Sequence, residues 1–291
     1  MADSIKMKLD GSQYRLPAQE DIDSAKQFVL QRNGYARILG ERIDDCLASA
    51  AEEIVAICYR YNVDPKTFEI SSGYNAQMMD EIAAVMDSLE EEILNLIYEY
   101  STRVTDDRKR ISALTVWLAT LGRGNRNLQE TLDVYLYRTM KDWEAAIAAL
   151  RAAGAEQGRA TAQLKTYLHA VYTMPEMLEA FDNAQDFTAT YIRSRGVMRG
   201  GVGLSNNGST NVVNMAKTTL QMAWMRGQVM EFQENGAAGY YQLRGSNYPC
   251  DICDAEVGFH TGVADTMENP LPHPHCMCYR VPIYKKNNQN T

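Results

Sequence analysis

Apolar residues recur every three or four positions from about residue 17 to about residue 195, and this period restricts the fold more than any other feature of the chain. Three sets are clearest: Ile43 to Tyr61, Ile82 to Tyr100 and Leu128 to Leu150. Such spacing places apolar side chains on one face of an α-helix and polar ones on the opposite face. Because the intervening segments are short, neighbouring helices should be antiparallel. The expected fold class is mainly α, with a bundle of long helices.

A glycine-rich stretch at 196–208 separates this bundle from the rest of the chain. It lacks the Gly-x-x-x-x-Gly-Lys-Ser/Thr pattern of a phosphate-binding loop, and no clear strand precedes it, which favours a linker or surface loop. Three arginines beside it form a local basic patch that is a candidate for DNA contact: Arg193, Arg195 and Arg199. The expected organisation is a helical bundle with an extended N-terminal arm over 1–195, the linker or loop over 196–208, and a C-terminal domain over 209–291.

The C-terminal domain is expected to be small and α+β. Its helix would be capped by Ser209 or Thr210 and would end at Gly236. Its buried stripe is expected to consist of Val213, Ala216, Leu220, Ala223 and Trp224. A short strand is predicted at Tyr240–Arg244, and alternating apolar residues predict a second strand within 277–284.

Four of the six cysteines and three of the four histidines lie in this domain. A Cys-x-x-Cys turn brings two thiolates within reach of one ion, and a second ligand pair about twenty residues further on closes a tetrahedron. Thiolate and imidazole ligands suit Zn²⁺. Four protein ligands leave no position for water, so a structural zinc is predicted. It would supply stability that a domain with few aliphatic residues lacks.

The zinc ligands are expected to be four of the residues Cys250, Cys253, His273, Cys276 and Cys278. The preferred set omits Cys278, which is the alternate to Cys276. His260 and His275 are interpreted as surface histidines. Three other interpretations stay open: a pair of disulfides, a redox Cys-x-x-Cys, and a nuclease that uses the histidines. The tight spacing of the cysteines, in a chain without a secretion signal, favours metal over disulfides.

Charge and composition exclude several functional classes. The 291 residues carry a net charge of −8, which argues against general coating of nucleic acid. No run approaches 18 uninterrupted apolar residues, and the N-terminus lacks the apolar segment of a signal peptide, so no membrane association is expected. The motifs Gly-x-Ser-x-Gly, His-Glu-x-x-His and Walker A are absent from the sequence. A non-enzymatic protein is therefore expected.

A series of short motifs over about 209–284 is distinctive. In order, it reads Ala216-Lys-Thr-Thr, Ala223, Gly227, Gly239-Tyr-Tyr-Gln-Leu, Cys250-x-x-Cys253, Leu271-Pro-His-Pro-His-Cys-Met-Cys278 and Val281-Pro282. This order resembles the C-terminal domain of the Mu F-like phage head morphogenesis (minor head) proteins. Their hallmark is a Cys-x-x-Cys followed by Pro-x-His-Pro-x-Cys-Arg-Cys. Met277 stands where the family has arginine, so a phosphate contact by that residue is not carried over.

The resemblance implies a minor structural protein of a tailed-phage or prophage head. Such a protein would act near the portal in capsid assembly, DNA packaging or ejection. Its partners would be the portal and other capsid proteins, within an oligomer or larger assembly. It would be found in the virion, and in the host cytoplasm during assembly. The alternatives are a phage-encoded enzyme carried in the head, of nuclease or toxin type, and a DNA-binding adaptor.

Overall fold

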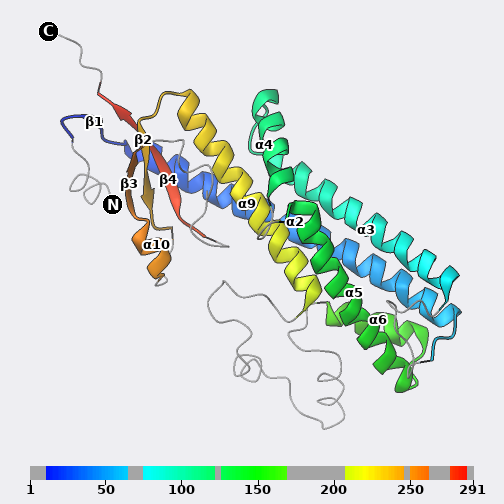
Figure 1. The fold of residues 1–291 in the computed structure, drawn as a ribbon. Coiled ribbons are helices and arrows are strands. Elements are labelled where there is room, and N and C mark those ends of the chain that lie inside the picture. The colour runs from blue at the N-terminus through cyan, green and yellow to red at the C-terminus, as the bar shows by residue number, and fades with distance from the viewer. Residues whose placement is uncertain are drawn as a thin grey trace. The chain divides into compact units, whose positions relative to one another are not determined.

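The computed structural model describes residues 11–64, 75–121, 126–168, 207–245, 250–261 and 276–286. Most of the described chain is helical (Figure 1). The helices before the glycine-rich stretch are α2 (Gln19–Arg60), α3 (Ala76–Thr102), α4 (Arg108–Thr120), α5 (Leu128–Ala152) and α6 (Gln157–Tyr167). Helix α9 (Gly208–Glu234) follows that stretch. None of these helices combines enough length and apolar character to span a membrane.

Four short strands form one antiparallel sheet in the order β1-β4-β2-β3. The strands are β1 (Tyr14–Arg15), β2 (Gly239–Leu243), β3 (Gly258–Thr261) and β4 (Tyr279–Lys285), and the short helix α10 (Asp251–Ala255) lies between β2 and β3 in sequence. The two strands predicted from the sequence are confirmed as β2 and β4. The expected mainly α fold with a small C-terminal α+β part is confirmed.

The N-terminal arm contributes to the same sheet. Tyr14 pairs with Lys285 and Arg15 pairs with Tyr284, so β1 forms an edge strand beside β4. The sequence predicted an extended arm, but it carried no sign of this pairing. A two-residue strand has no usable alternation of its own, and only its partner some 270 positions away defines it.

The chain divides into two compact units, each assembled from segments that are distant in sequence. One contains Met1–Ile38, Glu99–Leu118 and Lys217–Thr291, and the other contains Leu39–Tyr98 and Ala119–Ala216. Helices α2, α3 and α9 each contribute to both units. The linker expected at 196–208 falls almost entirely outside the described residues. The domain boundaries proposed from the sequence therefore stay a prediction.

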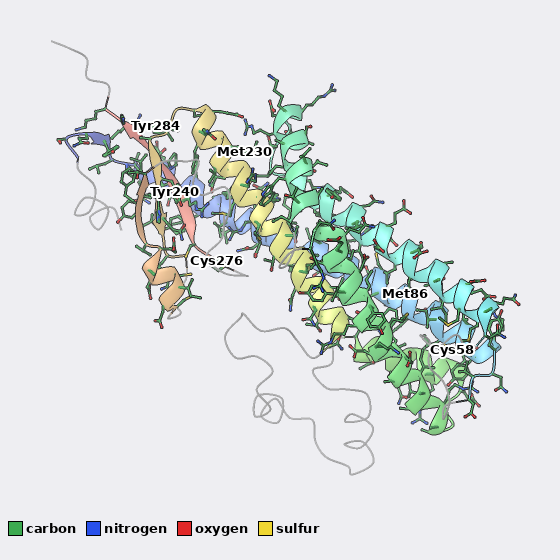
Figure 2. The ribbon with its side chains drawn as sticks, in the orientation of Figure 1. Cys58, Met86, Met230, Tyr240, Cys276 and Tyr284 are labelled. Atoms are coloured by element: carbon green, nitrogen blue, oxygen red, sulfur yellow. The ribbon has the colours of Figure 1, made fainter. Side chains whose placement is uncertain are left out.

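The first half of α2 packs on the sheet in the unit that contains the C-terminus. The apolar cluster between them consists of Ile22, Ala25, Val29, Tyr241, Leu243, Tyr279, Val281 and Ile283. The helix begins where the Ala18 amide donates to the Asp21 carboxylate at 2.8 Å, since a carboxylate in the first turn satisfies a free backbone N–H. Side chains of the sheet, with Tyr240 and Tyr284 labelled, are drawn in Figure 2.

In the other unit the predicted apolar stripes are buried. Ile43, Leu47 and Ile54 of α2, and Leu132 and Trp143 of α5, have no exposed surface. Helix α5 begins with a capping box, in which Asn127 and Glu130 each accept a hydrogen bond from the other's backbone N–H at 2.8 Å.

Helix α9 starts differently from the prediction. The residue that caps it is Asn207, whose side-chain oxygen accepts from the Thr210 amide at 3.1 Å. The predicted caps Ser209 and Thr210 lie inside the helix instead, so this prediction was wrong. Asn and Ser are almost equally good N-caps, and Asn207, Ser209 and Thr210 lie within four positions of one another, so the sequence leaves the first residue of the helix undecided. The predicted buried stripe is confirmed: Val213, Ala216, Leu220, Ala223 and Trp224 are all buried.

The end of α9 is a Schellman motif. Gly236 adopts a φ of 74°, its amide donates to Gln233, and the Ala237 amide donates to Phe232. The Gly236→Ala variant is expected to lower the free energy of unfolding by about 1–2 kcal/mol, because a Cβ is strained at this φ. Urea denaturation measures it. Gly236→Asn is the matched control, since asparagine tolerates the left-handed region; an equal loss in both variants would contradict the explanation.

An aromatic group surrounds Trp224 in the unit that contains the C-terminus. Its indole N–H donates to the Tyr100 carbonyl at 3.1 Å, and the rings of Tyr35 and Phe28 lie 5.1 and 5.6 Å from it. Tyr100 is in the last turn of α3, where backbone carbonyls have no partner within the helix.

Replacing Trp224 with phenylalanine is expected to lower the free energy of unfolding by about 1–3 kcal/mol, because the buried Tyr100 carbonyl loses its donor. Thermal unfolding monitored by circular dichroism would measure the change. As a control, Trp117→Phe removes an indole from the less enclosed helix α4 of the same unit. A loss at Trp117 as large as that at Trp224 would rule out the hydrogen bond as the cause.

Candidate metal centre

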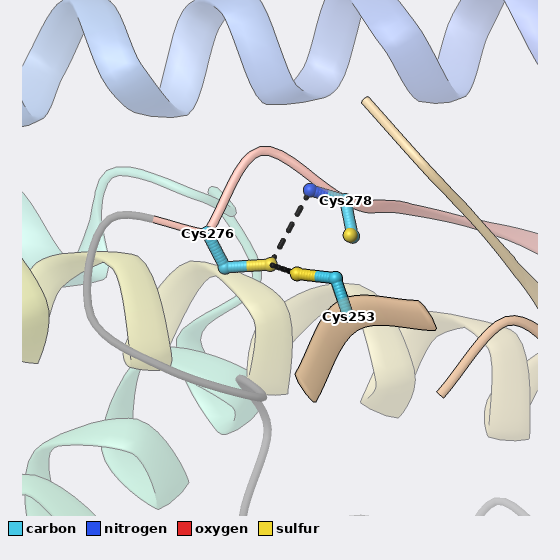
Figure 3. A group of neighbouring side chains, drawn as sticks. All are labelled: Cys253, Cys276 and Cys278. Atoms are coloured by element: carbon cyan, nitrogen blue, oxygen red, sulfur yellow. Dashed lines mark hydrogen bonds between the residues drawn. The ribbon is translucent and has the colours of Figure 1, made fainter. Parts of the chain in front are cut away.

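Three cysteines meet at one end of the sheet. Cys253 lies on α10, while Cys276 and Cys278 lie in the segment that enters β4 (Figure 3). All three are buried, and their sulfur atoms lie within 4.8 Å of one another. Alternation along an extended segment turns Cys276 and Cys278 to the same side, which is the arrangement that their spacing indicates. These residues could hold a metal ion.

The distances suit a metal with thiolate ligands. Cys253 Sγ and Cys276 Sγ lie 3.7 Å apart. Ligands at about 2.3 Å from a tetrahedral zinc are about 3.8 Å from one another, whereas a disulfide bond is about 2.05 Å long. None of the six cysteines, all of which lie among the described residues, forms a disulfide bond. The arrangement therefore differs from the disulfide alternative and fits a metal.

Cys250 borders the same group. It is the N-cap of α10, is half-buried and packs against the three buried cysteines. Its carbonyl accepts the Asp254 amide at 2.9 Å, so the first turn of α10 holds Cys250 and Cys253 on neighbouring positions of one short helix. Cys250 therefore lies beside the cluster, although it is not among the three cysteines whose sulfurs lie within 4.8 Å of one another.

Of the three histidines in this region, His260 lies among the described residues, and it is not part of the cysteine cluster. The preferred ligand His273 and the surface candidate His275 lie outside the described residues, so neither prediction is tested. His260 lies on β3, where a ring nitrogen is 2.8 Å from the Glu256 carbonyl oxygen and the ring stacks on Tyr240 at 5.0 Å. Within the described residues, the group that could hold a metal contains only cysteine.

The structure also changes the relation between two of the predicted ligands. From the sequence, Cys278 is the alternate to Cys276 in a set of four ligands. Both sulfurs belong to the described cluster, and the Cys278 amide donates to Cys276 Sγ at 3.4 Å. Both therefore belong to the one group that could hold a metal among the described residues, while the ligand set stays a prediction.

The thiols of the cluster have strongly different acidities. Hydrogen bonds from Cys276 and Cys253, the Gly245 amide and the positive charge of Arg244 lower the pKa of Cys278 to about 6, against the opposing effect of burial. The hydrogen bond to Cys278 and burial raise the pKa of Cys276. Burial is the main cause that raises the pKa of Cys253 to about 12. One thiolate is thus favoured without metal, and a bound metal ion would displace the remaining protons.

Arginines surround the cluster, which sequence reasoning missed. Arg32 of α2 has no exposed surface, and burial lowers its pKa to about 10. Arg280 of β4 is 3% exposed, and burial lowers its pKa as well. Arg244 is paired with Asp254 of α10. No local motif marks Arg32, because the residues it contacts lie about 240 positions away.

The other predicted contact residues are not placed. Arg193, Arg195 and Arg199 lie outside the described residues, so the DNA-contact hypothesis stays a prediction.

Comparisons with protein-family models, with curated proteins and with solved structures found no match.

Proposed function

We propose that the chain is a minor structural protein of a tailed-phage or prophage head, whose C-terminal sheet is stabilised by one zinc ion. In this role it acts without catalysis near the portal, in capsid assembly, DNA packaging or ejection, together with portal and capsid proteins. It resides in the virion after assembly in the host cytoplasm. The proposal joins the motif order of the C-terminal region with the site that the motif cysteines form.

The observation that carries the proposal is the convergence of the motif cysteines on a small antiparallel sheet. Cys253, Cys276 and Cys278 are buried within 4.8 Å of one another, and they belong to the motif that resembles the Mu F-like proteins. Thiolate ligands favour Zn²⁺ over hard cations. A buried cluster without a described imidazole or carboxylate ligand supports a structural ion more than a catalytic one.

The size of the sheet supports the same role for the metal. Its strands have two to seven residues, and short strands in a small sheet bury too little apolar surface for independent stability. A metal ion bound by both α10 and the segment before β4 would cross-link these two parts of the chain. We therefore assign the ion a structural role. The stabilised fold would present a rigid surface to neighbouring head proteins.

The test is incorporation into phage heads. The natural chain and a Cys253→Ser variant, each with an affinity tag, would be produced during head assembly in the phage's host, and heads would be purified on a density gradient. The natural chain is expected in the heads, where cross-linking should join it to the portal protein. The Cys253→Ser chain should be depleted from the heads. A control chain with a substitution at Cys58, which is buried in the other unit, should retain its zinc.

Three results would contradict the proposal. Purified heads that lack the natural chain would exclude a structural role in the virion. Metal-dependent cleavage of DNA by the purified chain, abolished in the His273→Ala variant, would favour the nuclease alternative instead. Retention on DNA that falls with rising salt, and is lost when the three arginines of the 193–199 segment become alanine, would favour the adaptor alternative.

A further inference from the structure

A charged residue occupies one position of the apolar stripe of α2. Ile22, Ala25 and Val29 recur at intervals of three and four residues and pack on the sheet. The next two positions of this stripe are Arg32 and Ala36, and both are buried. The periodicity of α2 calls for an apolar side chain where Arg32 stands. Because an arginine is almost never fully buried unless a partner compensates its charge, Arg32 needs a partner.

The surroundings of Arg32 point to the cysteine cluster as that partner. Its Nη2 donates to the Cys276 carbonyl at 2.5 Å, and the thiols of Cys276 and Cys278 lie within electrostatic range of its guanidinium. Arg280 is also within range and repels it. Figure 3 shows α2 beside the segment that carries the two cysteines. Of these neighbours, the two thiols can become negatively charged, as they do when they bind a metal.

Two of the three guanidinium nitrogens of Arg32 have no acceptor. Nε and Nη1 are buried, and neither makes a hydrogen bond in the part of the chain that the structure describes. In the same part of the chain, no carboxylate forms an ion pair with Arg32. A buried donor without an acceptor is destabilising, above all when it is charged. The contact with one carbonyl therefore does not account for the burial of Arg32.

The neighbouring residue of α2 holds the same segment. Asn33 donates from Nδ2 to the Met277 sulfur at 2.8 Å, and its Oδ1 accepts from Gln221 of α9 at 2.8 Å. Met277 stands between Cys276 and Cys278 in sequence. Two consecutive residues of α2 thus contact this segment, one at a backbone carbonyl and one at a side chain. These contacts fix the guanidinium of Arg32 beside the two cysteines.

We propose that Arg32 is a positioning residue of the metal centre, whose Nε–H and Nη1–H groups donate to the thiolate sulfurs of Cys276 and Cys278 when the metal is bound. Thiolates supply the negative charge that the buried guanidinium lacks, and sulfur accepts hydrogen bonds. The Nη2 contact holds the Cys276 backbone at the same time. Partners outside the ligand shell orient the ligands and stabilise their charge. The metal thereby links the C-terminal cysteines to the first half of α2.

The inference rests on the zinc centre of the proposed function and is independent of incorporation into heads. It concerns only the side of the centre that Cys276 and Cys278 form, so it is the same for every choice of the remaining ligands. It predicts that Arg32 acts on the bound sulfurs themselves, which a residue that only packs α2 on the sheet would not do.

Cobalt(II), bound in place of zinc, reports directly on the sulfurs through its sulfur-to-metal charge-transfer absorption. A positive charge that donates hydrogen bonds to a thiolate stabilises the electrons of the sulfur, which raises the energy of this absorption. In the cobalt-loaded full chain, Arg32→Met is therefore expected to move the band to longer wavelength. Arg32→Lys keeps the charge and should move the band less.

Val29→Ala is the matched control, because Val29 is buried one turn earlier in the same stripe. It weakens the packing of α2 on the sheet and leaves the charge near the sulfurs unchanged. We expect weaker metal binding with an unchanged band. An unchanged band in Arg32→Met would overturn the proposal, and so would an equal shift in Val29→Ala, since packing would then explain both.

Zinc affinity is measured on the same chains by competition with a chromophoric chelator. Arg32→Met is expected to bind zinc about 10–100-fold more weakly than the natural chain, as is typical when a partner of a ligand is lost. Arg32→Lys should fall between the two. Affinity in Arg32→Met equal to that of the natural chain would overturn the proposal.

If Arg32→Met does not fold, the natural chain decides. Loaded with an NMR-active isotope of cadmium, it should show scalar coupling between the metal and the side-chain N–H protons of Arg32, transmitted through the N–H···S hydrogen bonds. Absence of this coupling would overturn the proposal and leave the metal centre intact. A chain that binds neither zinc, cobalt nor cadmium would overturn the centre as well, so the two failures are distinguishable.

Discussion

Replacing Cys253 with serine is expected to reduce bound zinc from about one ion per chain to nearly none and to unfold the C-terminal sheet. Cys253 is 4% exposed and its sulfur lies 3.7 Å from that of Cys276, so it is an inner member of the cluster. For a structural site the free energy of metal binding is folding free energy, which amounts to about 10–16 kcal/mol in small zinc domains. Its loss exceeds the total stability of most domains.

Elemental analysis gives the zinc content, and hydrogen exchange followed by mass spectrometry locates the unfolding. Protection should be lost over β2, β3 and β4, whereas α5 and α6 of the other unit should keep theirs. Adding a zinc chelator to the natural chain should reproduce the pattern. The Cys46→Ala variant is the control, because Cys46 is buried in the other unit and is absent from the cluster. A stable, zinc-free natural chain with a protected sheet would refute the prediction.

The Gly245→Ala variant is expected to lose at least about 3 kcal/mol of unfolding free energy, together with most of its zinc affinity. A Cβ on Gly245 would lie 1.7 Å from the Met277 carbonyl oxygen and 2.6 Å from its carbon. Both atoms belong to the backbone, so no side-chain rotation can relieve the overlap. Met277 stands between Cys276 and Cys278 in sequence, and pushing it away moves both sulfurs.

Gly34→Ala is the matched control for this substitution. Gly34 lies within α2, and a Cβ there meets no atom within 4 Å. Since glycine in a helix interior is destabilising, this variant should gain about 0.5–1 kcal/mol. Chemical denaturation and zinc competition would be measured on both. If Gly245→Ala bound zinc as tightly as Gly34→Ala, the close approach of Gly245 to the cysteine segment would be disproved.

Local periodicity was sufficient to predict most of the helices. The stripes through Ile43, Ile93 and Leu132 correspond to helices α2, α3 and α5, and each of these residues is buried. Strand β4 was predictable for the same reason, because Val281 and Ile283 alternate with polar or partly exposed neighbours. In each case the burial of one face imposes a repeat that a single sequence displays.

Elements defined mainly by distant partners were missed or incompletely predicted. Strand β3 reads Gly258-Phe-His-Thr261, has no apolar alternation, and is a strand because it pairs with β2. Strand β1 has two residues and depends on β4. The discontinuous compact units have the same origin: a long helix such as α2 has one continuous sequence pattern while its two halves pack in different surroundings.

The amino-acid sequence by itself determined that cysteines would gather near the C-terminus, since the spacing of Cys250, Cys253, Cys276 and Cys278 is a local property. Only the tertiary structure placed Cys276 and Cys278 together with Cys253, and only it brought Arg32 to their side. Ligand spacing can be recognised within a few residues of sequence, because a single turn or strand orients the side chains. The presence of Arg32 at the cluster depends on which helix packs beside the cysteines, and long-range packing decides that.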